Sequence, residues 1–309
     1  MEIVIPRGIE IGHAQDEYTG VTAILAKNGA VAGVDVRGGA PGTRETDLLK
    51  TEKTVEKINA VVLAGGSAYG LAASCGVMDY LKENKIGYAM GKKVVPIVSG
   101  AVIYDLNDKE YHYPDQKMGY LACQNADREP SFGQVGAGKG ATVGKLRGFK
   151  YCCKSGIGAY TVKAAGGLVV TAIVVVNAFG DVVDETGKII AGAKGKDGFI
   201  DTEKTLVGGD LGKLLFGTNT TIGCVLTNAK IDKRGANKIA SVAHNGLARS
   251  IRPVHTDYDG DTLFCMSTAK VPVLNFAILQ SAAVLAVENA VRNAVQSGIG
   301  YDIQYTDEE

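Results

Sequence analysis

The chain has 309 residues, of which 46% are hydrophobic and 21% are charged, proportions typical of an ordinary globular protein. Its 33 Lys and Arg residues balance its 33 Asp and Glu residues, so the net charge gives no reason to expect a nucleic acid or an anionic membrane as a partner. A chain of this length buries roughly three quarters of its unfolded surface. No Pro- or Ser-rich linker divides it, which favours a single domain over residues 1–309.

The first half of the chain reads as short strands separated by glycine-rich turns. Apolar runs bounded by glycines predict hairpin-like strands over 9–13, 20–26 and 31–36. A glycine-rich loop over 38–43 follows, and it leads into a charged cluster. A buried strand over 59–63 then runs into a Gly-rich turn, and apolar residues at helical spacing predict a helix up to about residue 85.

Two motifs of the first half invite a catalytic or nucleotide-binding interpretation and fail on spacing. Ser67 is not expected to be a nucleophile, because Tyr69 occupies the place of the second glycine in a GxSxG elbow. The run from Gly136 to Lys145 is not a phosphate-binding loop, because Leu146 replaces the Ser or Thr that would follow the lysine. A second strand region, over 94–103, ends beside Tyr104.

The second half alternates strands with two amphipathic helices. Residues 107–135 predict a lid-like loop with a short helix, and residues 179–218 are rich in Gly, Lys and Asp and are expected to be exposed. Periodicity predicts four strands, at 160–163, 168–177, 221–229 and 262–267. It predicts helices over about 233–249 and about 274–297. This alternation alone favours a doubly wound α/β fold.

Three further features indicate the expected cofactors and cellular location: the cysteines, the N-terminal residues and the long apolar helix. The six cysteines, at 75, 123, 152, 153, 224 and 265, form no CxxC pair and are expected to be free thiols in a reducing compartment. The first 15 residues lack the features of a signal peptide, and charged and amide side chains interrupt the apolar region 271–295. We therefore expect a cytoplasmic protein with no membrane partner, cofactor or metal ion. A calcium loop at 257–267 is not expected either, because Ser267 stands where an EF-hand needs Glu.

Thr220 stands where a loop enters an apolar strand, and two carboxylates follow near position 260. If Thr220 became a chain N-terminus, one residue would supply a nucleophilic hydroxyl and a basic amine. The α-amine has a reference pKa of about 7.7–8.0, which suits a general base. Tyr104, Lys145 and Asn177 have ordinary interpretations by themselves: a core aromatic, an exposed lysine and a turn former. A side-chain amide such as that of Asn177 is also able to stabilise an oxyanion.

Five blocks of the sequence together resemble the L-aminopeptidase/D-esterase family, peptidase family S58, which also includes the 6-aminohexanoate (nylon) oligomer hydrolases. These blocks are VAGVDVRGGAPGTRETDLL, GGSAYGLAA, GAGKGATVGK, GTNTTIGCVLTNA and HNGLARSIRPVHTDYDGDTLF, and they cover nearly the whole chain. The resemblance implies an α+β fold, a four-layer αββα sandwich, and a precursor that cuts itself between Asn219 and Thr220. The products would be an α chain, 1–219, and a β chain, 220–309, assembled as a homotetramer of αβ units.

The resemblance also implies roles for individual residues. Thr220 would be the nucleophile, and Asp259 and Asp261 would orient its amine and hydroxyl. Tyr104 and Asn177 would stabilise the oxyanion, with Lys145 assisting electrostatically. The expected substrates are small peptides or amino-acid amides and esters, with 6-aminohexanoate-type oligomers among the candidates. Two alternatives stay open at this point: an acyltransferase of the ornithine acetyltransferase type and a catalytically silent binding homologue.

Overall fold

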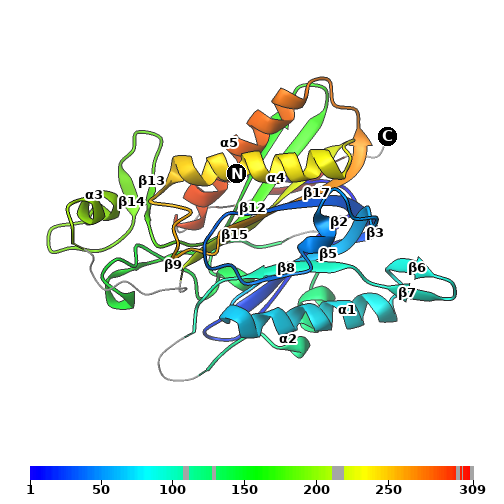
Figure 1. The fold of residues 1–309 in the computed structure, drawn as a ribbon, viewed down its shortest axis with the longest axis horizontal. Coiled ribbons are helices and arrows are strands. Elements are labelled where there is room, and N and C mark those ends of the chain that lie inside the picture. Colours follow the sequence, from blue (N-terminus) through cyan, green and yellow to red (C-terminus); the bar gives the residue numbers. More distant parts are fainter. Residues whose placement is uncertain (107–110, 127–129, 211–218, 297–299, 301, 307–309) are drawn as a thin grey trace.

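A computed structural model describes residues 1–106, 111–126, 130–210, 219–296, 300 and 302–306. The chain forms four layers (Figure 1). Helices α4 (Lys233–Ser250) and α5 (Phe276–Ala294) cover one side, and helices α1 (Ala73–Glu83) and α2 (Gln116–Gln124) cover the other. Two layers of β-strands lie between these helix pairs.

The strand layer under α4 and α5 contains four of the longer strands. They are β11 (Ile157–Ala164), β12 (Leu168–Asn177), β15 (Thr220–Ala229) and β17 (Thr262–Val271). Strand β12 is antiparallel to β11 and to β15, whereas β15 is parallel to β17. The second strand layer contains β2 (Ile9–Gln15), β5 (Lys57–Ala64), β8 (Val98–Val102) and β4 (Thr43–Arg44).

Strand β3 (Gly20–Val36) connects the two strand layers. Its last residues, 31–36, pair with β17, and its first residues, 20–26, pair with β2 and β5. The register with β5 shifts between Leu25 and Ala30, at the polar sequence Lys27-Asn28-Gly29. The sequence predicted two strands here, and the structure has one long strand with an irregularity between its halves.

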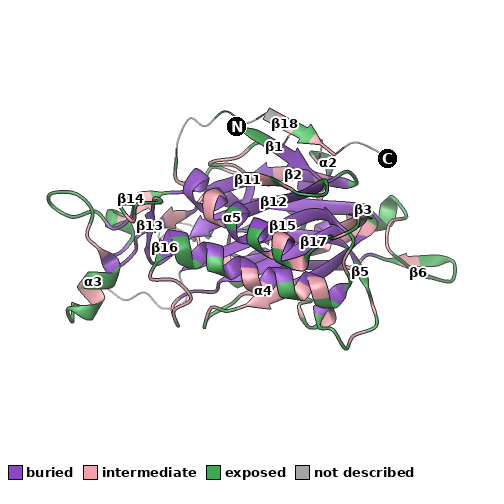
Figure 2. Cartoon of the chain, turned by 90° about the horizontal axis from the view of Figure 1, so that it is seen from above, coloured by how far each residue is buried: buried purple, intermediate pink, exposed green. Residues whose placement is uncertain are grey.

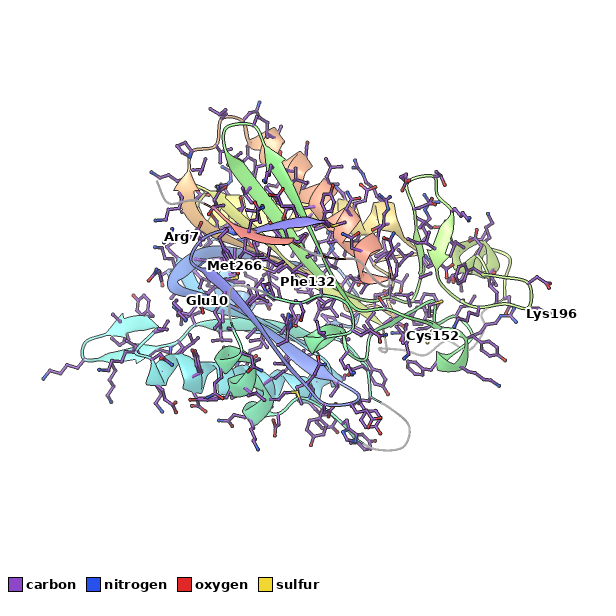
Figure 3. All side chains as sticks on the ribbon, turned by 180° about the vertical axis from the view of Figure 1, so that it is seen from behind. Arg7, Glu10, Phe132, Cys152, Lys196 and Met266 are labelled. Carbon is purple, nitrogen blue, oxygen red and sulfur yellow. The ribbon has the colours of Figure 1, made fainter. Side chains whose placement is uncertain are left out.

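Three apolar clusters separate the four layers. Residues of β12 alternate between two of them: Val170 and Val174 pack with α4 and α5, and Ile173 and Val175 pack between the strand layers. A third cluster lies between β5 and the helices α1 and α2. Burial on both faces explains why β12 reads as an unbroken apolar run. Met266, labelled in Figure 3, belongs to the middle cluster.

The three clusters confirm the α+β sandwich that the family resemblance implied, because each cluster fills the space between two successive layers. The doubly wound α/β fold favoured by periodicity alone is wrong. Its strands would be mainly parallel in one sheet, whereas β12 is antiparallel to both neighbours.

The two helices over the first strand layer begin at side-chain caps. Asp232 accepts a hydrogen bond from the Gly235 N–H at 2.8 Å, and Asn275 accepts one from the Ala277 N–H at 2.9 Å. Both helices turn a buried face toward the sheet (Figure 2). Of the helices in the described residues, none is both long enough and apolar enough to span a membrane.

The smaller elements lie around this core. The chain ends meet in a parallel pair, β1 (Glu2–Ile5) with β18 (Asp302–Tyr305). Strands β13 (Asp181–Val183), β14 (Ile189–Ala191) and β16 (Ile251–Arg252) form a small sheet beside α3 (Thr202–Val207). Lys196 lies at the outer edge of this part (Figure 3). The remaining strands form two short pairs, β6 (Tyr88–Met90) with β7 (Lys93–Val95) and β9 (Thr142–Val143) with β10 (Cys153–Lys154).

Candidate active site

Thr220 and Asn177 lie side by side at one edge of the first strand layer. Thr220 is the first residue of β15, Asn177 is the last residue of β12, and the two are paired in the antiparallel register. Asn219, directly before Thr220, forms an isolated parallel bridge with Asp259. Thr220 is only 4% exposed, and Asn177, Asn219 and Asp259 are buried. The fold therefore places three candidate residues and the expected cleavage point at one buried edge.

The loop from Asp259 to Asp261 wraps the Asn219–Thr220 peptide. The Gly260 N–H donates to the carbonyl oxygen of Asn219 at 3.0 Å, and the Asp261 carboxylate accepts from the Thr221 N–H at 2.7 Å. The hydroxyl of Thr220 donates to the same Asn219 oxygen. A methyl group on Gly260 would lie 2.8 Å from the Thr220 Oγ, so glycine is required for this close approach.

The glycine-rich loop after β3 supports the Asp259–Asp261 loop from behind. The N–H groups of Arg37 and Gly38 donate to the Asp261 carbonyl, and the Ala40 N–H donates to the Asp259 carbonyl at 2.8 Å. A Cβ on Gly38 would overlap the backbone of both aspartates. The glycines of this block thus shape the site.

Two charged residues that follow those glycines, Arg44 and Asp47, make their contacts with other parts of the chain. The Arg44 guanidinium contacts the Cys75 and Met78 sulfur atoms at 3.1 and 3.0 Å. Asp47 is exposed and pairs with Lys50 and Lys53. None of these four contacts involves a residue around Thr220.

Lys145 and Asn177 form a buried, hydrogen-bonded pair at the site. The Lys145 Nζ donates to the Asn177 backbone oxygen at 2.9 Å and to its Oδ1 at 2.7 Å. The Thr142 N–H also donates to this Oδ1, at 3.1 Å, which fixes the orientation of the amide. The Asn177 Nδ2 therefore faces the other way and donates to the backbone oxygen of Tyr104 at 3.0 Å. The structure thus brings Tyr104, Lys145 and Asn177 into one hydrogen-bonded group next to Thr220.

Burial perturbs the ionisation of two of these side chains. The pKa of Lys145 falls to about 7, because burial disfavours its charged form more than the nearby acidic groups favour it. The pKa of Asp259 rises to about 7, first because of burial and second because of the neighbouring Asp261 charge. Both groups therefore change protonation near neutral pH, a property common in catalytic sites.

Asp105 directly follows Tyr104 in the sequence, and sequence reasoning did not single it out. Its carboxylate accepts hydrogen bonds from the Gly66 N–H at 2.6 Å and the Thr19 hydroxyl at 2.8 Å. Burial raises the pKa of Asp105 to about 6. The Gly65–Gly70 turn thus contributes a backbone donor to a carboxylate beside the site.

Sequence reasoning also missed His255, Thr256 and Phe149. His255 donates to Asp261, and Thr256 donates to Asp259 through its N–H at 3.2 Å and its hydroxyl at 2.5 Å. The Phe149 ring stacks on Tyr104 with centroids 6.3 Å apart. The only sequence signal for His255 and Thr256 was their place a few residues before the aspartates.

The described residues contain neither a disulfide nor a cluster of side chains that could hold a metal ion. All six cysteines are free thiols. Within the described ranges, no three His, Cys, Asp or Glu side chains gather in an arrangement able to hold a metal ion.

Comparison with known proteins identifies the family. The model of peptidase family S58 matches residues 5–301. An uncharacterized aminopeptidase of Mycobacterium leprae is 44% identical, over 85% of this chain and 77% of the relative. A 6-aminohexanoate-oligomer endohydrolase of Paenarthrobacter ureafaciens is 32% identical, over 85% of this chain and 74% of the relative.

Two solved structures share the fold at low sequence identity. A β-aminopeptidase from Burkholderia sp. has a TM-score of 0.68 at 21% identity, covering 94% of this chain and 84% of its own. The L-aminopeptidase D-Ala-esterase/amidase from Ochrobactrum anthropi, described as a variant of the Ntn hydrolase fold, has a TM-score of 0.68 at 18% identity, covering 95% and 87%. The chain therefore belongs to peptidase family S58.

Proposed function

We propose that this chain cuts itself between Asn219 and Thr220 and then hydrolyses amide bonds with Thr220 as its N-terminal nucleophile. One observation carries the proposal. The Thr220 hydroxyl and the Gly260 N–H both donate to the carbonyl oxygen of Asn219, the carbonyl that self-cleavage would attack. The attacking group and a stabilising donor thus stand at the same peptide bond.

Maturation would proceed by an acyl shift at that peptide bond. The Thr220 Oγ adds to the Asn219 carbonyl carbon, and the Gly260 N–H stabilises the negative charge that develops on the oxygen. The C–N bond then breaks, the Thr220 nitrogen gains a proton, and an ester joins Asn219 to the threonine hydroxyl. Water hydrolyses this ester, which leaves an α chain, 1–219, and a β chain, 220–309.

Turnover would use both groups of the new N-terminus. The Thr220 Oγ attacks the substrate carbonyl, and the Thr220 α-amine takes the hydroxyl proton and passes it to the leaving amine. Asp261 accepts a hydrogen bond from the Thr221 N–H, and the Gly260 N–H of the same loop donates to the Asn219 carbonyl, so the new amine would form beside this loop. These carboxylates would orient the amine and hydroxyl of Thr220.

Tyr104, Asn177 and Lys145 would stabilise the transition state of that turnover. Asn177 is locked by Lys145 and by the Thr142 N–H, so its amide is oriented before a substrate arrives. Preorganised donors stabilise a developing oxyanion at little reorganisation cost. Lys145 would add positive charge at the same point whenever it is protonated.

The proposed substrates are amides of small peptides and amino acids. The support is the family, whose matched relatives include an aminopeptidase and a 6-aminohexanoate-oligomer endohydrolase. We propose further that the matured αβ unit assembles as a homotetramer.

The test compares substitutions at two adjacent threonines. Thr220→Ala should stay a single chain and lose hydrolysis of amino-acid p-nitroanilides by more than about 1,000-fold, since the attacking atom is gone. Thr220→Ser should retain both cleavage and turnover. Thr221→Ala is the matched control, because its Oγ1 has no hydrogen-bond partner among the described residues and its N–H contact to Asp261 is retained. A cleaved and active Thr220→Ala protein would refute the assignment.

A further inference from the structure

Phe149 is an apolar side chain at the edge of the candidate active site, and it is 37% exposed. Its ring stacks on the ring of Tyr104, with centroids 6.3 Å apart and planes inclined by 16°. The Lys145 Nζ lies 5.9 Å from the centroid of the same ring. Single exposed apolar residues are ordinary on protein surfaces, so the exposure of Phe149 alone indicates no function. What distinguishes this ring is that it adjoins two side chains of the proposed catalytic group.

A short series of contacts joins the Phe149 ring to the proposed nucleophile. Lys145 donates to the Asn177 Oδ1 at 2.7 Å, and the Asn177 amide donates to the backbone oxygen of Tyr104 at 3.0 Å. Asn177 pairs with Thr220 across two antiparallel strands, and the Cα atoms of such a pair are about 4.5–5.5 Å apart. A substrate whose carbonyl group lies between Thr220 and Asn177 would therefore have the two aromatic rings within reach.

The turn that carries Phe149 is fixed by its backbone. Gly148 has a φ of 86° and a ψ of 171°, a conformation that glycine adopts readily and other residues avoid. Its N–H donates to the Lys145 carbonyl at 2.8 Å, and its carbonyl accepts from the Tyr151 N–H at 3.0 Å. The thiol of Cys152, labelled in Figure 3, donates to the Phe149 carbonyl at 2.9 Å. A fixed backbone lowers the entropic cost of binding a substrate against the exposed side of the ring.

We propose that Phe149, together with Tyr104, binds the apolar side chain of the substrate's acyl group and so determines substrate preference. The inference rests on the proposed function, because it assigns one part of that substrate to one part of that site. The leaving amine must lie where the Thr220 α-amine is able to give it a proton, and this amine would form beside the Asp259–Asp261 loop. Phe149 lies in another segment, next to the tyrosine that would stabilise the carbonyl oxygen. The acyl group is therefore the part of the substrate that meets this ring.

This arrangement favours amides of amino acids with aliphatic or aromatic side chains. Each methylene group that leaves water completely is worth about fourfold in affinity for the transition state. A leucine side chain has three more carbon atoms than that of alanine, so its complete burial would raise kcat/KM by about 60-fold. Because the Phe149 ring covers one side of the substrate only, we expect a smaller preference, of about tenfold.

The test measures kcat/KM for leucine and alanine p-nitroanilides, which share a leaving group and differ only in the acyl side chain. The wild-type protein should favour the leucine substrate by about tenfold. Phe149→Ala removes the ring, so the ratio of the two kcat/KM values should fall about tenfold, to near one. Phe149→Tyr keeps the ring and should keep the ratio within about threefold of the wild-type ratio.

Tyr151→Ala is the matched control. It removes an aromatic ring that is 43% exposed and belongs to the same turn, but that ring lies 6.0 Å from the Lys150 Nζ instead of against Tyr104. Its ratio should stay within about twofold of the wild-type ratio. The ratio also separates substrate binding from damage to the fold or to the position of Tyr104, because such damage lowers both kcat/KM values by the same factor. Intact mass establishes that each variant is cleaved.

The outcomes distinguish this inference from the proposed function. A wild-type ratio in Phe149→Ala, in a cleaved and active protein, would overturn the inference alone, and so would a cleaved, active wild type without a preference for leucine. Where Phe149→Ala is not cleaved, Phe149→Gln, which keeps a long side chain without the apolar ring, is measured under the same expectation. A wild type that stays uncleaved or hydrolyses neither amide would overturn the proposed function and this inference with it.

Discussion

Asp259 is a buried acid whose ionisation opposes folding, and this predicts a specific pH dependence of stability. Its pKa rises from 3.8 to about 7 in the folded chain, a difference of about 3 pH units. Each unit corresponds to about 1.4 kcal/mol, so ionising this group lowers the free energy of unfolding by on the order of 4 kcal/mol. Between pH 4 and 7 the folded chain holds a proton that the unfolded chain has released. Stability therefore falls with rising pH across that window.

The substitution Asp259→Asn removes this ionisation. The amide nitrogen of asparagine cannot accept the hydrogen bond that the Thr256 N–H gives to Asp259. This loss lowers the free energy of unfolding by a similar amount at every pH. The stability of the Asn variant relative to the parent should therefore improve between pH 4 and pH 8 by on the order of 4 kcal/mol. The contributions of Asp105 and Asp181, whose pKa values are also raised, cancel because both proteins contain them.

The measurement is denaturant unfolding at pH 4, 5, 6, 7 and 8, with a linear extrapolation to water. Both proteins carry Thr220→Ala, so that each remains a single chain without a new amine next to Asp259. Identical pH dependences in the two proteins would refute the argument, because they would mean that Asp259 ionises as easily when folded as when unfolded.

Three further substitutions test the environment of the site. Gly260→Ala places a methyl group 2.8 Å from the Thr220 Oγ and should slow self-cleavage at least tenfold, as followed by intact mass over time. Cleavage at the wild-type rate would show that the loop shifts to accommodate the methyl group. Asp105→Asn weakens the hydrogen bonds that the carboxylate next to Tyr104 accepts from Gly66 and Thr19, and it should lower kcat about tenfold with little change in KM. An unchanged kcat in steady-state assays would show that these hydrogen bonds do not matter for turnover. Asp181→Ala removes the acceptor for three donors, two of them at the start of α3, and should destabilise that segment by about 2–4 kcal/mol. Amide hydrogen exchange in α3 measures this destabilisation, and unchanged protection of its amides would contradict the prediction.

The sequence predicted most of the elements, because their apolar periodicity is local. The strands 168–177 and 221–229 and the helix 233–249 lie within one residue of their observed bounds. Other features depend on distant partners. Strand β3 appears as two strands in the sequence because Lys27, Asn28 and Gly29 interrupt its apolar pattern. Strand β18 pairs with β1, at the other end of the chain, and local periodicity does not indicate such a distant partner.

The site residues were named from family motifs and could not be derived from periodicity. Lys145 alone looked like an exposed lysine, and only the fold shows it buried against Asn177. His255 gave no distinct signal, because its hydrogen bonds to Asp261 are made from a left-handed backbone at His255 that the sequence does not indicate. Part of the expected exposed segment before the cleavage point, residues 211–218, lies outside the described residues.

The central claim is that the peptide bond between Asn219 and Thr220 breaks without an added protease. Intact mass spectrometry of the freshly purified protein under denaturing conditions tests it most directly. The account predicts two chains, 1–219 and 220–309, with threonine at the N-terminus of the second. A single uncleaved chain after prolonged incubation, or cleavage at another bond, would contradict the account.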